Sequence, residues 1–292
     1  MNILDYIGNT PLVELKKISK KVRIFAKAEF LNPSGSIKDR IVKKMIERLE
    51  KKGLKKKGII EVTSGNTGIS LAFVSSVKGL DFTAVMPKNA SRERKLIIRH
   101  FGGKIIEVEK VKDFSQLIEI GKSVEKEIKG VLINQFQNVG NVEAQMELGN
   151  EIIRDLKNIE PDAFVAGIGT GGTLVGVGKV LKKKFSSIKI FGVEAAEKFG
   201  KHKIEGISDG FMPPFIKSNI KIIDGFIRVK SKDAINMAKK LAKKEGLFVG
   251  ISSGANVYAS LKVAKEIGVK IVVTVLPDRA DRYFSTELFG GD

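Results

Sequence analysis

Short apolar runs alternate with stretches of helical periodicity along almost the whole chain, and this alternation constrains the fold more than any other feature. The strand candidates are 23–30, 58–62, 82–86, 104–108, 131–135, 163–167, 188–193, 225–229, 247–250 and 270–276. The helix candidates are 37–52, 67–78, 91–101, 114–129, 142–157, 173–185, 232–245 and 255–267. This order is typical of parallel sheets with right-handed crossovers. Because one sheet of so many strands would be unusual, the sequence predicts an α/β fold of two three-layer αβα domains with mainly parallel, twisted sheets.

The composition excludes several kinds of site. The 292 residues include no cysteine and two histidines, which excludes disulfides and a cysteine nucleophile, and we expect no metal centre. The net charge is +19, but the lysines are scattered over the polar faces of predicted helices with few aromatic residues beside them. That pattern favours a solvated surface over nucleic-acid binding. We find no apolar run of about 18 residues and no secretion signal, so we expect a cytoplasmic protein that contacts no membrane.

Ligands of α/β folds bind where strands end and helices begin, and four such places stand out. The first is "AGIGTGGT", residues 166–173. Its glycines let the backbone approach a ligand, the helix start favours an anion, and Thr170 and Thr173 add hydroxyl groups, so we expect a phosphate. The spacing Gly-x-Gly-x-x-Gly in 167–172, with Glu194 after the next strand, also matches a dinucleotide fingerprint. A glycine-rich turn without a ligand is the remaining interpretation.

The second and third places also begin helices. In "VTSGNTG", residues 62–68, four small polar side chains crowd together: Thr63, Ser64, Asn66 and Thr67. One side chain suffices to cap a helix, so four of them favour a second anion site, of a size that suits a carboxylate. "VGISSGA", residues 249–255, offers the neutral hydroxyl groups of Ser252 and Ser253. Helix capping is the alternative interpretation in both places.

The fourth place is Lys38 in "NPSGSIKDR", residues 32–40. Ser36 looks like a helix cap, and Lys38 precedes the apolar Ile41 and Val42 on one helix face. Burial and the positive end of the helix dipole favour a neutral amine, which suits a Schiff base. The alternative is a lysine that extends into water. A Schiff-base lysine, a phosphate site, a carboxylate site and a neutral hydroxyl group together indicate pyridoxal 5'-phosphate (PLP) with a bound amino acid.

These motifs resemble the cysteine synthase (O-acetylserine sulfhydrylase) family of fold-type II PLP-dependent enzymes, which share the tryptophan synthase β-like fold. The resemblance covers essentially the whole chain. Its motifs, in family order, are "IGNTPLVEL", "NPSGSIKDR", "EVTSGNTGISLA", "NQFQNVGN", "GTGGTLVGVG", "GISSGA" and "LPDRADRYFST". So many motifs in order argue against the dinucleotide interpretation.

The resemblance implies a role for each site residue. Lys38 would form the imine with the cofactor and, once released, remove the α-proton of the substrate. Asn66 would bond the 3'-oxygen of PLP, and Ser253 would meet its pyridine nitrogen. The phosphate would be held by Gly169, Thr170, Gly171, Gly172 and Thr173. The substrate would be held by Thr63, Ser64, Gly65, Thr67 and Gln135 at its carboxylate and by Gly206 at its amine.

The resemblance also implies an organisation. A smaller, mobile N-terminal domain would span 36–140, and a larger domain that binds the PLP phosphate would comprise 1–35 and 141–292. The family usually forms homodimers, so we expect one here. We also consider a serine acetyltransferase as a partner, but the sequence offers no support for it.

Ser253 indicates a reaction class, because a neutral group at the ring nitrogen withdraws less charge into the ring than a carboxylate would. Loss of a group from the β-carbon is then favoured. The chain departs from the family at Ser208-Asp209, where two small residues are usual. We predict Asp209 as a base for water or a thiol, so that cysteine gives serine and sulfide, or two cysteines give lanthionine. The alternative is a loop aspartate that orders a turn before Gly210.

Other functions stay open at this stage. Ordinary cysteine synthase, which makes cysteine from O-acetylserine and sulfide, is the nearest alternative. A serine or threonine dehydratase, an NAD-binding oxidoreductase and a non-catalytic binding module are more distant ones. "DRADRY", residues 278–283, resembles a variant form of cysteine synthase that uses different sulfur donors or acceptors.

Overall fold

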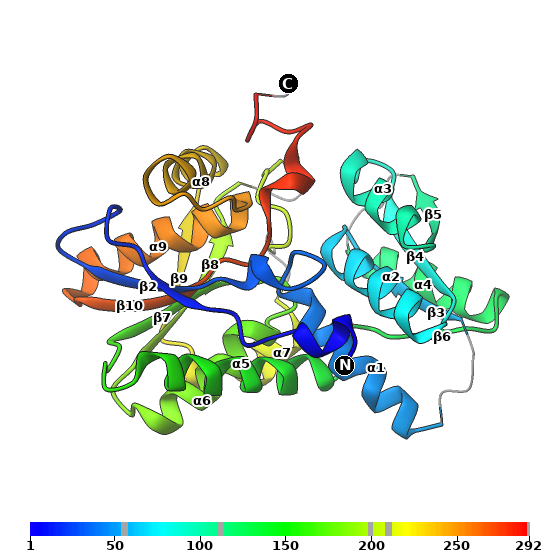
Figure 1. The fold of residues 1–292 in the computed structure, drawn as a ribbon, viewed down its shortest axis with the longest axis horizontal. Coiled ribbons are helices and arrows are strands. Elements are labelled where there is room, and N and C mark those ends of the chain that lie inside the picture. Colours follow the sequence, from blue (N-terminus) through cyan, green and yellow to red (C-terminus); the bar gives the residue numbers. More distant parts are fainter. Residues whose placement is uncertain (54–57, 110–113, 198–200, 208–211, 291–292) are drawn as a thin grey trace.

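The computed structural model describes residues 1–53, 58–109, 114–197, 201–207 and 212–290, and within them the chain forms two separate sheets (Figure 1). The larger sheet has six strands in the order β1-β2-β10-β7-β8-β9. Their bounds are β1 Leu12–Glu14, β2 Arg23–Lys27, β7 Ala163–Gly167, β8 Lys189–Ala195, β9 Gly225–Val229 and β10 Ile271–Val275. Strand β1 pairs antiparallel with β2, and the other pairs are parallel.

Helices cover both faces of the six-stranded sheet (Figure 1). One face carries α5 (Gly140–Leu156) and α6 (Gly172–Lys184), and the other carries α8 (Ser231–Glu245) and α9 (Ile251–Ile267). Alternate residues of a strand therefore enter different cores: Phe164 packs with α5 and α6, whereas its neighbour Val165 packs on the side of α8 and α9. This division follows from the two-residue period of a strand.

The smaller sheet has four parallel strands in the order β5-β4-β3-β6. They are β3 Ile59–Val62, β4 Phe82–Pro87, β5 Lys104–Val108 and β6 Val131–Leu132. Its helices are α1 Lys38–Lys51, α2 Asn66–Lys78, α3 Arg92–His100 and α4 Phe114–Glu127. Ile59 faces the core that α1 and α2 share, whereas Ile60 faces Val124 of α4.

Short helices complete the chain: η1 Ile3–Tyr6, η2 Glu29–Leu31, α7 Pro214–Ser218, η3 Ile220–Ile222 and η4 Ala280–Tyr283. No helix in the described ranges combines the length and apolar character needed to cross a membrane.

The predicted α/β class with two mainly parallel sheets is confirmed, and several details are corrected. The segment 247–250 is not a strand of either sheet, because α8 and α9 lie so close in the chain that only an isolated bridge from Val249 to Arg279 forms. Helix α9 begins at Ile251, four residues earlier than expected. Strand β1 was not predicted, since its three half-buried residues carry no periodic signal. The domain boundaries at 36–140 stay a prediction.

A buried ionic network fixes the first turn of α1. The Arg40 guanidinium donates to Glu29 at 2.6 Å and to Glu151 of α5 at 2.7 Å; Arg40 and Glu29 are buried, and Glu151 is partly buried. Burial by itself would raise the pKa of Glu151, but the hydrogen bond and charge of Arg40 outweigh it and lower that pKa to about 2. Lys38 lies two residues away, so this network sets its position relative to the larger sheet.

Replacing Arg40 by methionine is expected to reduce the free energy of unfolding by about 3–5 kcal/mol, because it leaves the Glu29 carboxylate buried without its cation. Arg40→Lys keeps a charge and should cost less. Urea unfolding of the three proteins measures both effects. A loss below about 1 kcal/mol in Arg40→Met, the level of a surface ion pair, would contradict the assignment.

Candidate active site

Loops from the carboxyl ends of strands in both sheets meet in one place. Asn66, at the start of α2 behind β3, donates to Asp278, which follows β10, at 2.6 Å. Ile37, just before α1, donates its N–H to the carbonyl oxygen of Pro277 at 2.8 Å. The helix starts that carry Lys38 and Asn66 are thus both bonded to the segment that follows β10.

Lys38 is the first residue of α1, and its N–H donates to Ser36 Oγ at 3.3 Å. The residue as a whole is half-buried, but protein atoms surround its amine closely enough to desolvate it. Desolvation lowers the pKa of the amine below its usual value, and the nearby Asp278 carboxylate counteracts part of that shift. Among the described residues the amine makes no hydrogen bond, so its net tendency is toward the neutral, nucleophilic form.

In the loop before α6, glycines let a ligand come close to the backbone. Gly171, the N-cap of the helix, has a left-handed conformation (φ 84°) and no side chain, and the Gly172 N–H donates to Thr170 Oγ1 at 3.3 Å. A Cβ at Gly169 would lie 2.4 Å from the carbonyl oxygen of Gly206, and one at Gly172 would lie 2.0 Å from Asn141 Oδ1. The buried Thr170 hydroxyl lies in the same loop, and Thr173 is half-buried. Backbone N–H groups at a helix start, without side chains in the way, favour an anion.

Ser253 lies in the first turn of α9, whose N-cap, Gly250, makes no side-chain capping bond. The Ser253 side chain is fully buried, and its hydroxyl has no hydrogen-bond partner among the described residues. Capping therefore does not explain Ser253. A buried hydroxyl without a partner is costly, and a ligand nitrogen at this helix start would satisfy it.

The side chains of the 62–68 loop divide into two groups. Thr63 Oγ1 accepts from the N–H groups of Gly65 and Gly68, so this side chain caps the start of α2, and its predicted role at the substrate carboxylate stays a prediction. Thr67 Oγ1 donates to Gln135 Oε1 at 2.7 Å, which joins the two segments expected to hold the substrate carboxylate. Ser64 is exposed at the tip of the loop.

Glu61 supports Gln135 from inside the smaller sheet, and the sequence did not single it out. Its carboxyl group accepts from the N–H groups of Gln135 at 3.2 Å and Val62 at 3.1 Å, and the residue is 1% exposed. Burial raises the pKa of Glu61 to about 8, although these hydrogen bonds act in the opposite direction. The carboxyl group is therefore protonated at neutral pH.

Asn141 joins the two anion sites and was also missed as an individual residue. Its Nδ2 donates to the carbonyl oxygen of Gln135 at 2.8 Å and to Thr170 Oγ1 at 2.9 Å. The motif "NQFQNVGN" contains it, so a signal existed, but only tertiary structure brings it to Thr170.

Arg94 of α3 packs against the 62–68 loop at Gly65. It is 1% exposed, forms an ion pair with Glu205, and lies over the ring of Tyr283 at 4.6 Å. A Cβ at Gly65 would lie 1.9 Å from Arg94 Cδ, so Gly65 makes room for this side chain. Glu205 precedes Gly206, whose positive φ of 82° suits glycine. Nothing in the charged helix pattern around Arg94 signals that it is buried.

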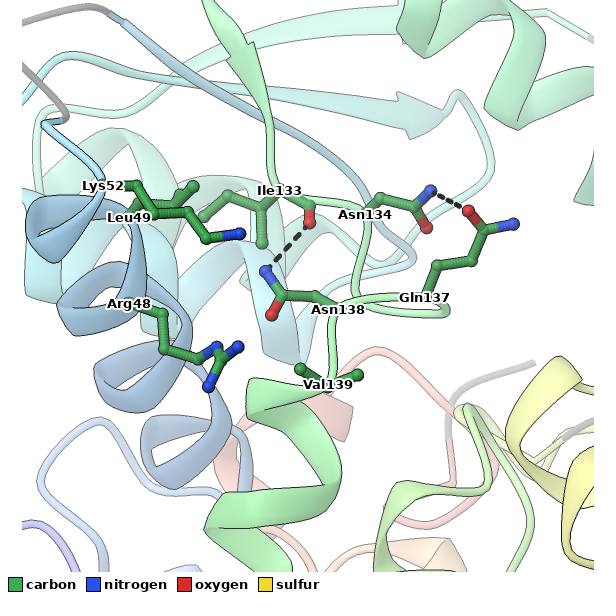
Figure 2. A pocket seen from close by; sticks show the side chains of 8 residues that line it. All are labelled: Arg48, Leu49, Lys52, Ile133, Asn134, Gln137, Asn138 and Val139. Atoms are coloured by element: carbon green, nitrogen blue, oxygen red, sulfur yellow. Dashed lines mark hydrogen bonds between the residues drawn. The ribbon is translucent and has the colours of Figure 1, made fainter.

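An open pocket lies beside the loop that carries Gln135, but none of the predicted ligand-binding residues lines it (Figure 2). Its walls are Arg48, Leu49 and Lys52 of α1 and residues 133, 134 and 137–139. Arg48 is already paired with Glu143 at 2.7 Å. We therefore place the active site at the strand ends and not in this pocket. Asp209, with Ser208, lies outside the described residues.

The residues present fit PLP. Lys38 offers a desolvated amine for the aldehyde, the start of α6 offers backbone N–H groups for the phosphate, and Ser253 offers an unpaired hydroxyl for the ring nitrogen. Bound there, PLP would bring its reactive carbon to an amine and its ring nitrogen to a neutral group.

Comparison with known proteins identifies the family. The family model for pyridoxal-phosphate dependent enzymes matches residues 3–278. Cysteine synthase B of Campylobacter jejuni is 44% identical over 298 residues, which cover 98% of each chain. The structure of an O-acetylserine dependent cystathionine β-synthase from Helicobacter pylori superposes with a TM-score of 0.93 at 37% identity, covering 99% of this chain and 98% of that one. A hydrogen sulfide-producing enzyme from Fusobacterium nucleatum gives 0.91 at 38% identity, covering 97% and 99%.

Fold and site together define an α/β PLP-dependent enzyme. The chain belongs to the pyridoxal-phosphate dependent enzyme family and, within it, to the cysteine synthase type. The interpretation of 167–172 and Glu194 as a dinucleotide site is thereby wrong. Glu194 instead lies 3.6 Å from Arg228 of the adjacent strand.

The neutral Glu61 predicts a pH dependence of stability. Between the usual pKa near 4.5 and its native value of about 8, the folded chain holds a proton that the unfolded chain has released. The free energy of unfolding should therefore fall as pH rises across that window and level off above it. Glu61→Gln removes this slope, which urea unfolding from about pH 5 to pH 8.5 would measure. The surface variant Glu119→Gln should keep the wild-type slope, and an unchanged slope in Glu61→Gln would refute the assignment.

Removing the Ser253 hydroxyl should affect apoprotein and holoenzyme differently. In the apoprotein Ser253→Ala deletes an unpaired buried group, so its melting temperature should equal or exceed that of wild type. PLP affinity should fall by about five- to tenfold, the worth of one hydrogen bond. Calorimetry and fluorescence titration with PLP measure the two effects, and Ser252→Ala is the matched control. Unchanged PLP affinity in Ser253→Ala would show that the hydroxyl does not meet the cofactor.

Proposed function

We propose that the chain catalyses a PLP-dependent β-replacement on a three-carbon L-amino acid, with hydrogen sulfide as product or nucleophile. The reaction that we place first converts L-cysteine and water to L-serine and hydrogen sulfide. The observation that carries the reaction class is Ser253, a buried neutral hydroxyl at the start of α9 where other cofactor chemistry would require a carboxylate.

When bound, PLP withdraws electrons from the α-carbon of the attached amino acid and so loosens its proton. A serine at the ring nitrogen cannot hold a positive charge there, so less of the developing charge spreads into the ring. Departure of the group on the β-carbon then competes well with reprotonation at the α-carbon. The site thus favours exchange of β-substituents.

Lys38 is positioned to move the α-proton. Its amine has a lowered pKa through desolvation, so the neutral base is more populated than in a solvated lysine. The N–H groups and hydroxyls of the 63–67 loop, held to Gln135 by Thr67, suit the substrate carboxylate. The ion pair of Arg94 with Glu205 holds Gly206 near this loop, which supports our assignment of Gly206 to the substrate amine.

The identity of the nucleophile rests on Asp209, which is argued from the sequence. Sulfide is already nucleophilic near neutral pH, whereas water needs a base and a thiol benefits from one. A carboxylate at residue 209 would supply that base at the β-carbon and would disfavour bulky anionic activated serines. The hydrogen sulfide-producing relative from Fusobacterium nucleatum supports this direction. Joining two cysteines to lanthionine and hydrogen sulfide would use the same base.

Ordinary cysteine synthase activity, O-acetylserine and sulfide giving cysteine and acetate, is the second candidate. The 44% identity with a cysteine synthase B over 98% of the chain favours it. Homodimeric assembly, a cytoplasmic location and closure of a domain over 36–140 are further proposals, carried over from the resemblance.

One experiment separates the candidates. Purified holoenzyme is incubated separately with L-cysteine, L-serine and O-acetylserine plus sulfide, and the products are identified by mass spectrometry. We expect serine and sulfide from cysteine alone, and Lys38→Ala should form neither. If cysteine yields no sulfide while O-acetylserine yields cysteine, the second candidate replaces the first.

Asp209→Asn should lower the rate of serine formation from cysteine by about a hundredfold, the usual contribution of a general base. Synthesis of cysteine from O-acetylserine and sulfide should change far less, because sulfide needs no base. Parallel assays of the two reactions in wild type and variant provide the measurement. An unchanged rate from cysteine would exclude Asp209 from the reaction.

A further inference from the structure

The segment 278–283, "DRADRY", is explained by neither the fold nor the proposed reaction, yet it contacts the site directly. Asp278 is fully buried, and its Oδ2 accepts from Asn66 Nδ2 at 2.6 Å and from the Tyr283 hydroxyl at 2.7 Å. Arg282 is also fully buried, and its Nη1 donates to Asn66 Oδ1 at 2.9 Å. One amide side chain is therefore held at both ends by groups of opposite charge.

These two contacts determine which way the Asn66 amide faces. A guanidinium only donates and a carboxylate only accepts, so Oδ1 must face Arg282 and Nδ2 must face Asp278. If the amide were reversed, Nδ2 would face the Arg282 guanidinium, donor against donor. Oδ1 would then face the Asp278 carboxylate, acceptor against acceptor. The second hydrogen on Nδ2 is left to point elsewhere, since only one bond from this nitrogen is made within the described residues.

We call Asp278 and Arg282 the clamp, because they hold the two ends of the Asn66 amide. Both clamp residues are tightly packed. A Cβ at Gly250 would lie 2.2 Å from Asp278 Oδ1, and one at Gly35 would lie 2.6 Å from Arg282 Nη2, so backbone packs directly on both side chains. Arg282 Nη2 also donates to the carbonyl oxygen of Ser34 at 2.8 Å. Burial and the Asp278 charge raise the pKa of the Tyr283 phenol far above its usual range, so Tyr283 remains a donor to Asp278.

We propose that Asp278 and Arg282 are positioning residues that fix Asn66 as a hydrogen-bond donor to the phenolic 3'-oxygen of PLP. They act through Asn66 and do not need to touch the cofactor. The proposal rests on PLP binding by this family and on the assigned role of Asn66, and it is independent of which substrate reacts.

The clamp also links the two sheets at the cofactor. Asn66 begins α2 on the smaller sheet, whereas Asp278 and Arg282 follow β10 of the larger sheet. Asp278 lies near Lys38 as well, where its charge opposes the desolvation of the amine. The Asp278 carboxylate thus affects both Lys38, expected at the PLP aldehyde, and Asn66, expected at the 3'-oxygen. A test of Asp278 must therefore separate its effect on Lys38 from its effect through Asn66.

A double-mutant cycle makes this separation. Asp278→Asn, Asn66→Ala and the double variant are compared with wild type in PLP dissociation constant and in the visible absorption spectrum of the bound cofactor. Asp278→Asn should weaken PLP binding by about tenfold and shift the absorption maximum when Asn66 is present, but change affinity by less than about twofold in Asn66→Ala. Asp224→Asn, a partly buried aspartate bonded to the Ile190 N–H far from the clamp, should leave both quantities unchanged.

Equal effects of Asp278→Asn with and without Asn66 would overturn the proposal, because the carboxylate would then act on Lys38 or on stability alone. Unchanged affinity in Asp278→Asn would overturn it too. If Asp278→Asn fails to fold, the cycle is run with Arg282→Lys, which loosens the other end of the same amide and predicts the same non-additivity. Neither the PLP dissociation constant nor the absorption spectrum requires turnover. The proposed reaction can therefore be disproved without affecting the proposal about Asp278 and Arg282.

Discussion

The rest of the structure depends on keeping one lysine amine poorly solvated at the start of a helix. Lys38 begins α1, where the helix dipole and desolvation both disfavour its charged form. Two residues on, Arg40 is buried in an ionic network with Glu29 and Glu151. Within a single helical turn, the Arg40 cation is thus paired with carboxylates, whereas the Lys38 amine is desolvated and makes no hydrogen bond in the described part of the chain. This difference makes Arg40 a structural residue and leaves the Lys38 amine available for reaction.

The two sheets share no strand pair in the described ranges, and hydrogen bonds of loops and helix starts connect them. Asn141 joins the segment at Gln135 to the glycine-rich loop at Thr170, and Asn66 joins α2 to the segment behind β10. Amides suit these positions because they donate and accept at once without adding charge. PLP bound between the two sheets would therefore be held by side chains whose orientation is set by partners from both sheets.

Much of the fold was predictable because periodicity and turn chemistry are local. The alternation of apolar runs and helical patterns predicted both sheets and most helices, and the glycine-rich loops predicted that helices begin directly behind β3 and β7. Predictions were wrong where local pattern and context conflicted. Residues 247–250 are apolar but lie between two helices that leave no room for a strand. The buried Glu61 and Arg94 escaped notice, because a charged residue in a strand or helix pattern normally indicates solvent.

The sequence by itself determined which reactive groups the chain contains. These are an amine at the start of a helix, two loops of small residues suited to anions, and a neutral serine at the start of α9, where a charged group would direct the cofactor differently. Only the tertiary structure decided how these groups are oriented and how they titrate. Orientation depends on partners far away in the chain, as the placement of Asn66 between Asp278 and Arg282 shows. Titration depends on desolvation, and that is a property of the atoms packed around a group and cannot be read from its neighbours in sequence.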